Sequence, residues 1–563
     1  MFLLININKY NTDVLVIGGG LAGISAALEA ARSGVRATIV VADKIFSGSS
    51  FSPYTWGLGI VSPYNELDKK DLLESIYDVG CGLVDRELSF ILTDNIEQRI
   101  RELEYLGIKF KTPQNIIGDE TLIPCFDRKH RKWYGFTFEN SKHIFYDKIK
   151  ELNINILEHQ KIVKLFTNKE VFTGALGINK NNQLTFFDAS SVVIATGGFG
   201  GLFKHNLNTE DINGEGLILA LSAGCELINL EFLQFIPGYL KPKYKTIFAE
   251  KSFKYVTLED SEGNSIIKKY FPEYVHEREI MTERSTHGPF SSRMASKYVD
   301  IAIYKESLRD KFNHGAKVKY DMYISNDKGF MIKEYFNWLE KTRGIKYDEE
   351  IIITTFAHAS NGGIRINKDA ETNVKGIYAA GEVTGGMHGA DRIGGLSTAN
   401  ALVFGKIAGQ NAALFAKSHK NYISKDIIKK EITSYISNIK VSKYNPNFIS
   451  DKIKNLMWEN ANVIRNDRNL KYAINEIEKL SIFTKHEIEF DNLQKTNLNN
   501  IIKAQNYIKL SLLLLNTMLL RKESRGSHYR EDYPNQRDEF NKFIIVSQNE
   551  NAIIEYKTES PKT

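Results

Sequence analysis

The chain has 563 residues, too many for one hydrophobic core, and this length predicts two or three domains. With 42% hydrophobic and 25% charged residues, and no apolar run long enough to cross a bilayer, the composition is that of a globular protein without a membrane span. The net charge of +6 is modest, and no nucleic-acid-binding motif accompanies it. The three scattered cysteines fit neither a disulfide framework nor metal-ligand spacing, so we expect no metal site and a reducing, cytoplasmic setting.

The first strong pattern in the chain is a glycine-rich turn between a strand and a helix. Residues 13–17 (DVLVI) are typical of a buried strand, and an Ala-rich amphipathic helix is expected over 21–33. Between them, the spacing Gly-x-Gly-x-x-Gly permits a tight turn and the close approach of a pyrophosphate, whose charge the helix N-terminus stabilises. Against the alternative of an ordinary tight turn, the pattern predicts dinucleotide contacts at Gly18, Gly20, Leu21, Ala22 and Gly23.

A second strand is expected over 37–41, and the residues after it extend the predicted nucleotide site. Asp43 has about the spacing of an acid that binds a ribose hydroxyl, although it can lie one residue beyond the strand end. Further cofactor contacts are predicted at Lys44, Ser49, Ser50 and Gly57. Residues 190–203 read as another buried strand that runs into glycines, and Glu215 is expected at the same edge of the sheet.

The most informative stretch is 376–409, because its parts make physical sense around a flavin. A short apolar strand ends in Gly381-Glu382, and an exposed His/Arg pair, His388 and Arg392, follows. Gly394-Gly395 then precede a helix over 398–412, with Ser397 as its natural N-cap. Glycines let a flat ring lie close to the backbone, and the helix start offers N–H groups to a reduced, anionic flavin. The cofactor contacts predicted here are Glu382, Ser397 and Thr398.

The order of these signals predicts an α/β fold: a Rossmann-like FAD-binding domain, interrupted by an α+β capping domain and followed by a C-terminal helical domain. Active sites favour such domain interfaces, where a lid excludes water. The predicted division is 1–236 and 350–419 for the FAD-binding domain, 237–349 for the cap, 420–522 for the helical domain, and 523–563 for a polar, mostly irregular tail.

Several motifs together resemble one family. They are GGGLAGISAALEAARSG (18–34), ATGGFGGLF (195–203), NGEG (213–216), HASNGG (358–363), GIYAAGEVTGGMHGADRIGG (376–395) and SRGSHYREDYP (524–534). Over nearly its whole length the chain resembles the flavoprotein subunits of succinate dehydrogenase and fumarate reductase, together with L-aspartate oxidase. The resemblance implies FAD, a mobile cap, and hydride transfer between flavin N5 and a carbon of a C=C or C–C bond next to a carboxylate.

The resemblance also implies three catalytic residues. Arg293 matches the arginine that transfers the proton, with Glu279 and Glu283 as candidate relay groups; a surface ion pair is the alternative role for this arginine. His358 and Arg392 match the residues that hold one end of the substrate, where an arginine gives planar, bidentate recognition of a carboxylate. Their alternatives are a packed core histidine and a surface ion pair.

Two departures from the family pattern bear on the substrate and the cofactor. Ile236, in QFIP, replaces the histidine that helps bind the second carboxylate, so the far end of the substrate is expected to be altered, and apolar or neutral unless another cation fills in. Residues 47–59 lack the histidine that carries FAD covalently in respiratory complexes, so we expect FAD to be bound noncovalently. The candidate replacement cations are Lys245, Lys251 and His287.

A third departure concerns residues 125–140, where the amine-recognising segment of L-aspartate oxidase is not recognisable. This segment contains Arg128, His130, Arg131 and Trp133, which form either part of the substrate pocket or a basic surface loop.

The leading functional hypothesis is an FAD-dependent oxidoreductase acting on a C=C (or C=N) bond of a small carboxylate. L-aspartate oxidase, which forms iminoaspartate for NAD biosynthesis, is the closest alternative. A flavoprotein subunit that passes electrons to an iron–sulfur partner is a second one. A nucleic-acid-modifying flavoprotein and a nicotinamide-only dehydrogenase are distant options, since no motif supports the first and the flavin signals oppose the second.

Overall fold

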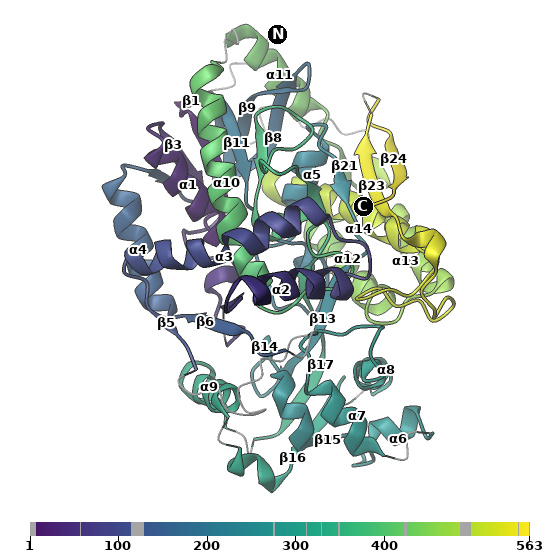
Figure 1. Ribbon diagram of the computed structural model, residues 1–563. Helices are drawn as coiled ribbons and strands as arrows, with labels where there is room; N and C mark the ends of the chain where they lie inside the picture. Colours follow the sequence, from purple (N-terminus) through teal and green to yellow (C-terminus); the bar gives the residue numbers. More distant parts are fainter. Residues whose placement is uncertain are drawn as a thin grey trace.

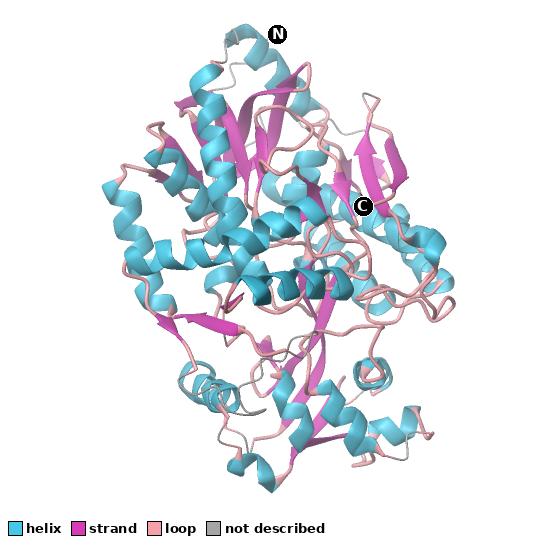
Figure 2. Cartoon of the chain, in the orientation of Figure 1, coloured by secondary structure: helices cyan, strands magenta, loops and turns pink. Residues whose placement is uncertain are grey.

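The computed structural model places the nucleotide-type sheet and its helices in the upper part of the molecule, the cap at the bottom, and the C-terminal helices and hairpin at the right (Figure 1). The same view coloured by secondary structure shows that helices and strands are mixed in both the upper part and the cap (Figure 2). The structure describes residues 7–56, 58–113, 126, 129–273, 276–310, 312, 314–327, 329–346, 349–420, 425–484, 497–549 and 551–561.

A five-stranded parallel sheet forms the centre of the upper part. Its strand order is β19 (Ile377–Ala379), β11 (Ser191–Ile194), β2 (Val14–Ile17), β3 (Ala37–Val40) and β7 (Asn155–Leu157). Every residue of β2, β3, β11 and β19 is buried, as parallel strands covered on both faces require. Val, Ile and Leu dominate these strands, which explains why continuous apolar runs in the sequence identified them.

Two helices from opposite ends of the domain pack side by side against this sheet. They are α1 (Leu21–Arg32), directly after β2, and α10 (Leu396–Ser418) (Figure 1). Glycines on α10 make the contact close: a Cβ added at Gly409 would lie 2.1 Å from the carbonyl oxygen of Ala26. The packing joins two halves of the chain that the cap separates in sequence.

A four-stranded sheet in the order β1 (Ile7–Asn11), β10 (Leu184–Asp188), β9 (Val171–Asn179) and β8 (Gln160–Asn168) lies beside the nucleotide sheet. The described part of the opening segment therefore belongs to the fold, as expected. The apolar face of α11 (Lys425–Ser437) covers this sheet through Ile432, Ile436 and Ile439. Further elements near the cavity are α2 (Glu66–Val79), α3 (Arg86–Tyr105), α4 (Phe138–Glu151), and a small sheet of β4 (Gly59–Ser62), β6 (Lys132–Phe136) and β5 (Phe110–Lys111).

The cap is built on a second five-stranded sheet. Its order is β14 (Thr246–Ile247), β13 (Leu233–Lys241), β17 (Ile351–Ser360), β16 (Ala316–Tyr320) and β15 (Val256–Glu259). The long strands β13 and β17 carry the chain into and out of the cap, so the predicted boundary at 236/237 falls inside β13. The cap helices are α6 (Ile266–Tyr270), α7 (Glu277–Arg284), α8 (Lys297–Arg309) and α9 (Phe330–Trp338).

The C-terminal region is helical at first, with α12 (Pro446–Asn460), α13 (Asp467–Leu480), α14 (Leu498–Leu520) and the short pair β21 (Val441–Ser442) and β22 (Phe483–Thr484). Our prediction of a mostly irregular tail was wrong. β23 (Phe543–Gln548) and β24 (Ile554–Glu559) form a hairpin that completes a sheet with β12 (Leu227–Ile228), β18 (Gly363–Arg365) and β20 (Thr384–Gly385). The partner strand β12 lies about 300 residues upstream, and such pairing is invisible to local sequence patterns.

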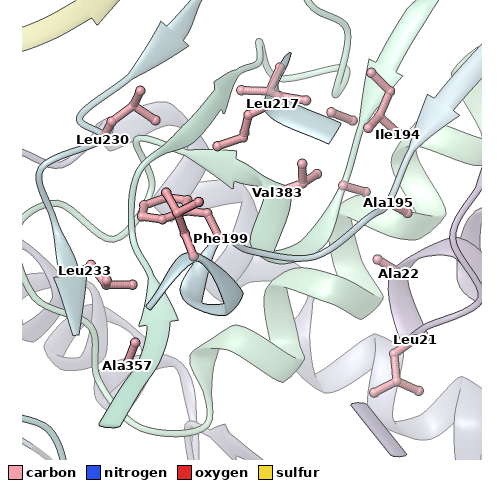
Figure 3. Close-up of a cluster of buried hydrophobic side chains, with 14 of the residues drawn as sticks. Leu21, Ala22, Ile194, Ala195, Phe199, Leu217, Leu230, Leu233, Ala357 and Val383 are labelled. Atoms are coloured by element: carbon pink, nitrogen blue, oxygen red, sulfur yellow. The ribbon is translucent and has the colours of Figure 1, made fainter. Parts of the chain in front are cut away.

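The domains share one continuous core. Figure 3 shows side chains from α1, β11, α5 (Glu215–Leu221) and the cap strands β13 and β17 in a single apolar cluster. Leu21, Ala22 and Ile194 come from the nucleotide domain, while Leu233 and Ala357 come from the strands that lead to the cap. This core fixes the roots of the cap strands against the nucleotide loop. No helix in the described part of the chain has the length and apolar character needed to cross a membrane.

Candidate active site

A cavity of about 360 Å³ lies between the nucleotide domain and the cap. It brings together residues that are up to 380 positions apart in the sequence. The predicted site residues on its wall are Gly18, Gly20, Leu21, Ala22, Ser49, Ser50, Glu215, His358, Glu382, Arg392, Ser397 and Thr398. Gly23, Asp43, Lys44 and Arg293 are not on this wall, and Gly57 lies outside the described residues.

The glycine-rich turn has the geometry that its spacing predicts. Gly18 has a φ of +115°, and a Cβ added there would lie 2.3 Å from the carbonyl oxygen of Ala195. A Cβ at Gly23 would lie 2.0 Å from the carbonyl oxygen of Gly18, so this glycine permits the close approach of helix and strand from below the wall. Gly20 precedes the first residue of α1 and directs the helix N-terminus toward the cavity.

The acid expected to bind ribose points elsewhere. β3 ends at Val40, and Val41 and Ala42 continue along the cavity wall. The side chain of Asp43 is 59% exposed and lies 3.6 Å from His159, and the adjacent Lys44 is also exposed. The position that faces the cavity after this strand is therefore Ala42, one residue earlier than the spacing suggested.

Ser50 and Glu215 are fixed on the wall by hydrogen bonds. Ser50 Oγ accepts a bond from the N–H of Leu21 at 3.3 Å. Glu215, the first residue of α5, is paired with Lys161 at 2.6 Å and accepts bonds from the side-chain amides of Asn213 and Asn506. Desolvation raises the pKa of this carboxyl, but the charge and hydrogen bond of Lys161 outweigh it, so the net pKa lies below the ordinary value.

The wall fits a bound dinucleotide. Among the described residues, Gln160 Nε2, Thr196 Oγ1 and Asn208 Oδ1 are buried on this wall without a hydrogen-bond partner. Buried polar atoms are normally satisfied, so a ligand with several polar groups is the expected partner for them. The glycine turn and the two helix starts, α1 and α10, supply N–H groups at the same wall.

The start of α10 differs from the prediction. The helix begins at Leu396, and its N-cap is Gly395, whose φ is +82°. Ser397 is therefore a first-turn residue that faces the cavity, and its expected role as N-cap was wrong. A glycine is required at 395 because an added Cβ would lie 2.6 Å from the N of Val61. The backbone of β4 thus leaves no room for a capping side chain.

Glu382 is a buried carboxyl group on the opposite side of the same wall. It accepts a hydrogen bond from the N–H of Ser360 at 3.0 Å and another from the Ser360 hydroxyl at 3.2 Å. A Cβ added at Gly198 would lie 2.2 Å from Glu382 Oε1, so this glycine makes space for the carboxyl group. Burial raises the pKa of Glu382, and the Ser360 hydrogen bonds oppose that shift.

His358 reaches the cavity through an irregularity in the cap sheet. On β13, Gln234 pairs with Ala359 and the next residue, Phe235, pairs with Ala357, so His358 is the extra residue of a β-bulge. Bulges re-aim side chains in this way. Burial, and secondarily the charge of Arg392, lowers the pKa of His358 to about 3, so its imidazole is neutral near pH 7 and donates from one nitrogen only.

Arg392 lies on the same wall and is buried, as is His388. Our expectation of an exposed His388/Arg392 pair was therefore wrong, because the segment passes beneath the cap and the C-terminal region. Burial, and secondarily the charge of Arg392, lowers the pKa of His388 to about 3. Neither ring nitrogen of His388 has a hydrogen-bond partner in the described part of the structure.

Arg293 lies just outside the cavity wall. Its guanidinium carbon is 5.8 Å from the ring centroid of Phe126, which does line the cavity. Its Nε is 3.6 Å from Asp391, and its Nη1 is 3.6 Å from Asp78. The side chain is 22% exposed. The arginine is therefore close to the site, behind an aromatic side chain of the wall.

The acidic neighbours of Arg293 are different from those expected. Glu279 is exposed on α7, and the carboxylate of Glu283 accepts a hydrogen bond from the N–H of Ser296. Instead Asp391, which is 1% exposed and accepts a 2.5 Å bond from Ser291 Oγ, lies beside Arg293. Burial, opposed by Arg293, raises the pKa of Asp391 to about 7. Sequence reasoning missed Asp391, although its position next to Arg392 in GADR was a usable signal.

The segment 125–140 is divided between structure and site. Arg131 is buried in ion pairs with Asp68 and Asp71, and His130 is exposed. Trp133 lines the cavity, while Arg128 lies outside the described residues. Glu250, which the sequence reasoning did not single out, also lines the cavity, and burial raises its pKa.

A parallel nucleotide sheet with a glycine-rich turn, interrupted by a cap that closes over a cavity with polar dinucleotide contacts, defines an FAD-binding oxidoreductase. Residues 13–398 match the FAD binding domain family, and residues 450–562 match the fumarate reductase flavoprotein C-terminal family. The chain belongs to the FAD-binding family of fumarate reductase and succinate dehydrogenase flavoproteins. The family resemblance, the fold class and FAD as cofactor are thereby confirmed.

Relatives with different activities match the chain about equally well. An uncharacterized FAD-dependent oxidoreductase of Methanocaldococcus jannaschii is 30% identical over 95% of this chain and 96% of its own length. A subunit of the fumarate reductase (CoM/CoB) of Methanothermobacter marburgensis is 28% identical, covering 96% and 97%. The L-aspartate oxidase of Saccharolobus solfataricus is also 28% identical, covering 95% and 100%. Among solved structures, the E. coli quinol fumarate reductase FrdA has a TM-score of 0.80 at 19% identity, covering 99% and 98%, which shows the shared fold.

Proposed function

We propose that this FAD-dependent oxidoreductase transfers hydride between flavin N5 and one carbon of a C=C or C–C bond next to a carboxylate. The observation that supports the proposal is the convergence of Arg392 and His358 on the wall that also carries the glycine-rich turn. An arginine is suited to planar, bidentate binding of a carboxylate, and the neutral imidazole of His358 adds one donor. When bound, FAD supplies or accepts the hydride.

The dinucleotide is assigned to the turn Gly18–Gly23, the first turns of α1 and α10, and the wall residues Ser49, Ser50, Glu215 and Glu382. Lys161 keeps Glu215 ionised, so this carboxylate is available to accept hydrogen bonds from sugar hydroxyls. Asp43 and Lys44 receive no contact in this proposal, because they do not line the cavity. We infer noncovalent binding, since the described residues of 47–59 that line the cavity include no histidine, cysteine or tyrosine.

Arg293 is assigned the proton transfer. An arginine has an ordinary pKa above about 12, so it gives up a proton only to a strongly basic centre, such as a carbanion that forms next to the carboxylate. Asp391, 3.6 Å from Arg293 Nε, orients the guanidinium. Because Phe126 separates Arg293 from the cavity, the transfer requires that this ring and the guanidinium move relative to each other.

The test is the Arg293→Gln variant, loaded with FAD and assayed anaerobically with a reduced viologen as electron donor and unsaturated carboxylates as acceptors. Turnover should be abolished while the flavin absorbance of the purified protein is retained. Near-normal turnover would remove Arg293 from the mechanism. Asp78→Asn is the matched control, because it alters the other, 82% exposed neighbour of Arg293.

L-aspartate oxidase remains a second candidate, favoured by the relative of that name at 28% identity. Anaerobic addition of L-aspartate would bleach the flavin absorbance if this activity is present, whereas an unchanged spectrum would exclude it. The names of two relatives are those of subunits, which supports an electron-transfer partner, such as an iron–sulfur protein, as the physiological donor or acceptor. Co-purification of a cysteine-rich protein with the full chain tests this assignment.

A further inference from the structure

The cavity wall beyond His358 is mainly apolar. Leu207, Ile236, Ile247 and Phe356 form one buried cluster, and Trp56 packs against it. Ile236 pairs with Phe356 across β13 and β17, two residues before His358. We call the lining residues of this region the apolar arm: Trp56, Trp133, Leu207, Ile236, Ile247 and Met331. The arm therefore adjoins the proposed carboxylate site directly.

The apolar arm has an aromatic surface that is held in place. Gly59 and Gly135 lie directly opposite each other on β4 and β6, and the indole of Trp133 lies against both. A Cβ at Gly59 would be 2.0 Å from Trp133 Nε1, and one at Gly135 would be 2.2 Å from Trp133 Cη2. Trp56 stacks on Trp133 with ring centroids 6.5 Å apart and an interplanar angle of 30°. Because rigid aromatic surfaces lose little entropy on binding, they suit a flat, apolar ligand group.

No second cation faces this arm among the described residues. Lys245 is 3.5 Å from Glu210 and lies over the Tyr54 ring, and it does not line the cavity. His287 is buried against Ser296 and the carbonyl of Pro289. Lys251 is also absent from the wall. The sequence-based candidates for a replacement cation therefore do not fill this role.

The charged groups that do line the cavity also disfavour a second carboxylate. Besides Arg392, the only lining cation in the described chain is Lys161, which is paired with Glu215. Glu250, on the cap side of the wall, is an acid close to Gly288. A substrate carboxylate in this region would be buried against apolar side chains and near another acid, without a compensating cation.

We propose that the substrate is a monocarboxylate of the 3-aryl-2-enoate class, with cinnamate as the simplest example. Its carboxylate lies at Arg392 and His358, and its aromatic ring lies in the apolar arm against Trp133 and Ile236. This inference rests on the proposed function. The π bond between C2 and C3 is consumed: hydride from reduced FAD adds to C3, and a proton from Arg293 adds to C2. The product is the saturated acid, and an external electron donor reduces the oxidised FAD again.

The experiment measures reduced-viologen oxidation by the FAD-loaded full chain with cinnamate, crotonate and fumarate. We expect kcat/KM for cinnamate to exceed that for fumarate at least about 100-fold, because fumarate buries an unpaired charge. Trp133→Leu should lower kcat/KM for cinnamate about 10-fold, through KM, and leave crotonate within about twofold. Ile236→His should raise the fumarate-to-cinnamate ratio about 10-fold or more, while Leu240→His, a control on the same strand but off the wall, should not.

The outcomes separate this inference from the proposed function. If fumarate is the better substrate and Arg392→Gln abolishes its reduction, the carboxylate site stands and the aryl-enoate assignment is overturned. If none of the three acids oxidises the viologen while the protein carries FAD, both the assignment and the proposed function fail. If Ile236→His does not fold, the Trp133→Leu comparison of cinnamate with crotonate decides the question alone.

Discussion

Asp391 gives the sharpest prediction about stability. Its carboxyl group is 1% exposed, accepts a bond from Ser291 Oγ, and has a pKa raised from 3.8 to about 7 by burial, with Arg293 as the main opposing charge. The folded protein therefore holds this proton at a pH where the unfolded chain has released it. Stability contributed by the protonated group is lost as pH rises from about 4 to about 7. Asp391→Asn keeps the shape and removes the titration.

The size of the effect follows from proton linkage. Between pH 5 and pH 8, a shift from 3.8 to about 7 removes roughly 2.7 kcal/mol from the wild type relative to Asp391→Asn. An unfolding entropy of about 2.1 cal/mol/K per residue gives roughly 1.2 kcal/mol/K for the chain of 563 residues. The difference in thermal midpoint, variant minus wild type, should therefore increase by about 2 °C from pH 5 to pH 8.

The assay is thermal unfolding of the FAD-loaded protein, followed by flavin fluorescence and circular dichroism at both pH values. Asp78→Asn provides the control, because it removes the other carboxylate beside Arg293 from a position that is 82% exposed; its midpoint should change with pH in parallel with the wild type. An unchanged difference between Asp391→Asn and wild type at the two pH values would refute the assignment of a proton to buried Asp391.

Three further predictions concern the cofactor site. Gly23→Ala should be purified without flavin or unfolded, since its Cβ would lie 2.0 Å from the carbonyl oxygen of Gly18; Gly48→Ala, whose Cβ would have only an ordinary contact at 3.9 Å, should retain FAD, and flavin absorbance per chain distinguishes them. Lys161→Met leaves Glu215 buried without its cation and should cost about 3 kcal/mol, more at pH 8 than at pH 5, and adding Glu215→Gln should restore much of the thermal midpoint. Acid precipitation should release all the flavin into the supernatant, and a yellow pellet would contradict noncovalent binding.

The sequence by itself determined the nucleotide-binding half of this protein. The strand, turn and helix around Gly18–Gly23 are local, because glycine freedom, helix start and apolar run act within about 20 residues. The residues of the GADR and HASNGG motifs could also be assigned, since those motifs carry the family resemblance. Their positions on one wall confirm the spatial convergence that such an assignment requires, while their catalytic roles stay predictions.

Only the tertiary structure decided which side chains face the cavity. Asp43 turns to solvent because β3 ends three residues earlier, and Ser397 loses its capping role because β4 requires Gly395. Arg293 and Asp391, 98 positions apart in the sequence, meet where the cap lies against the start of α10. The apolar arm likewise combines β4, β6 and the cap strands. Such contacts depend on how separate elements pack, and a chain pattern with a period of two or 3.6 residues carries no record of that packing.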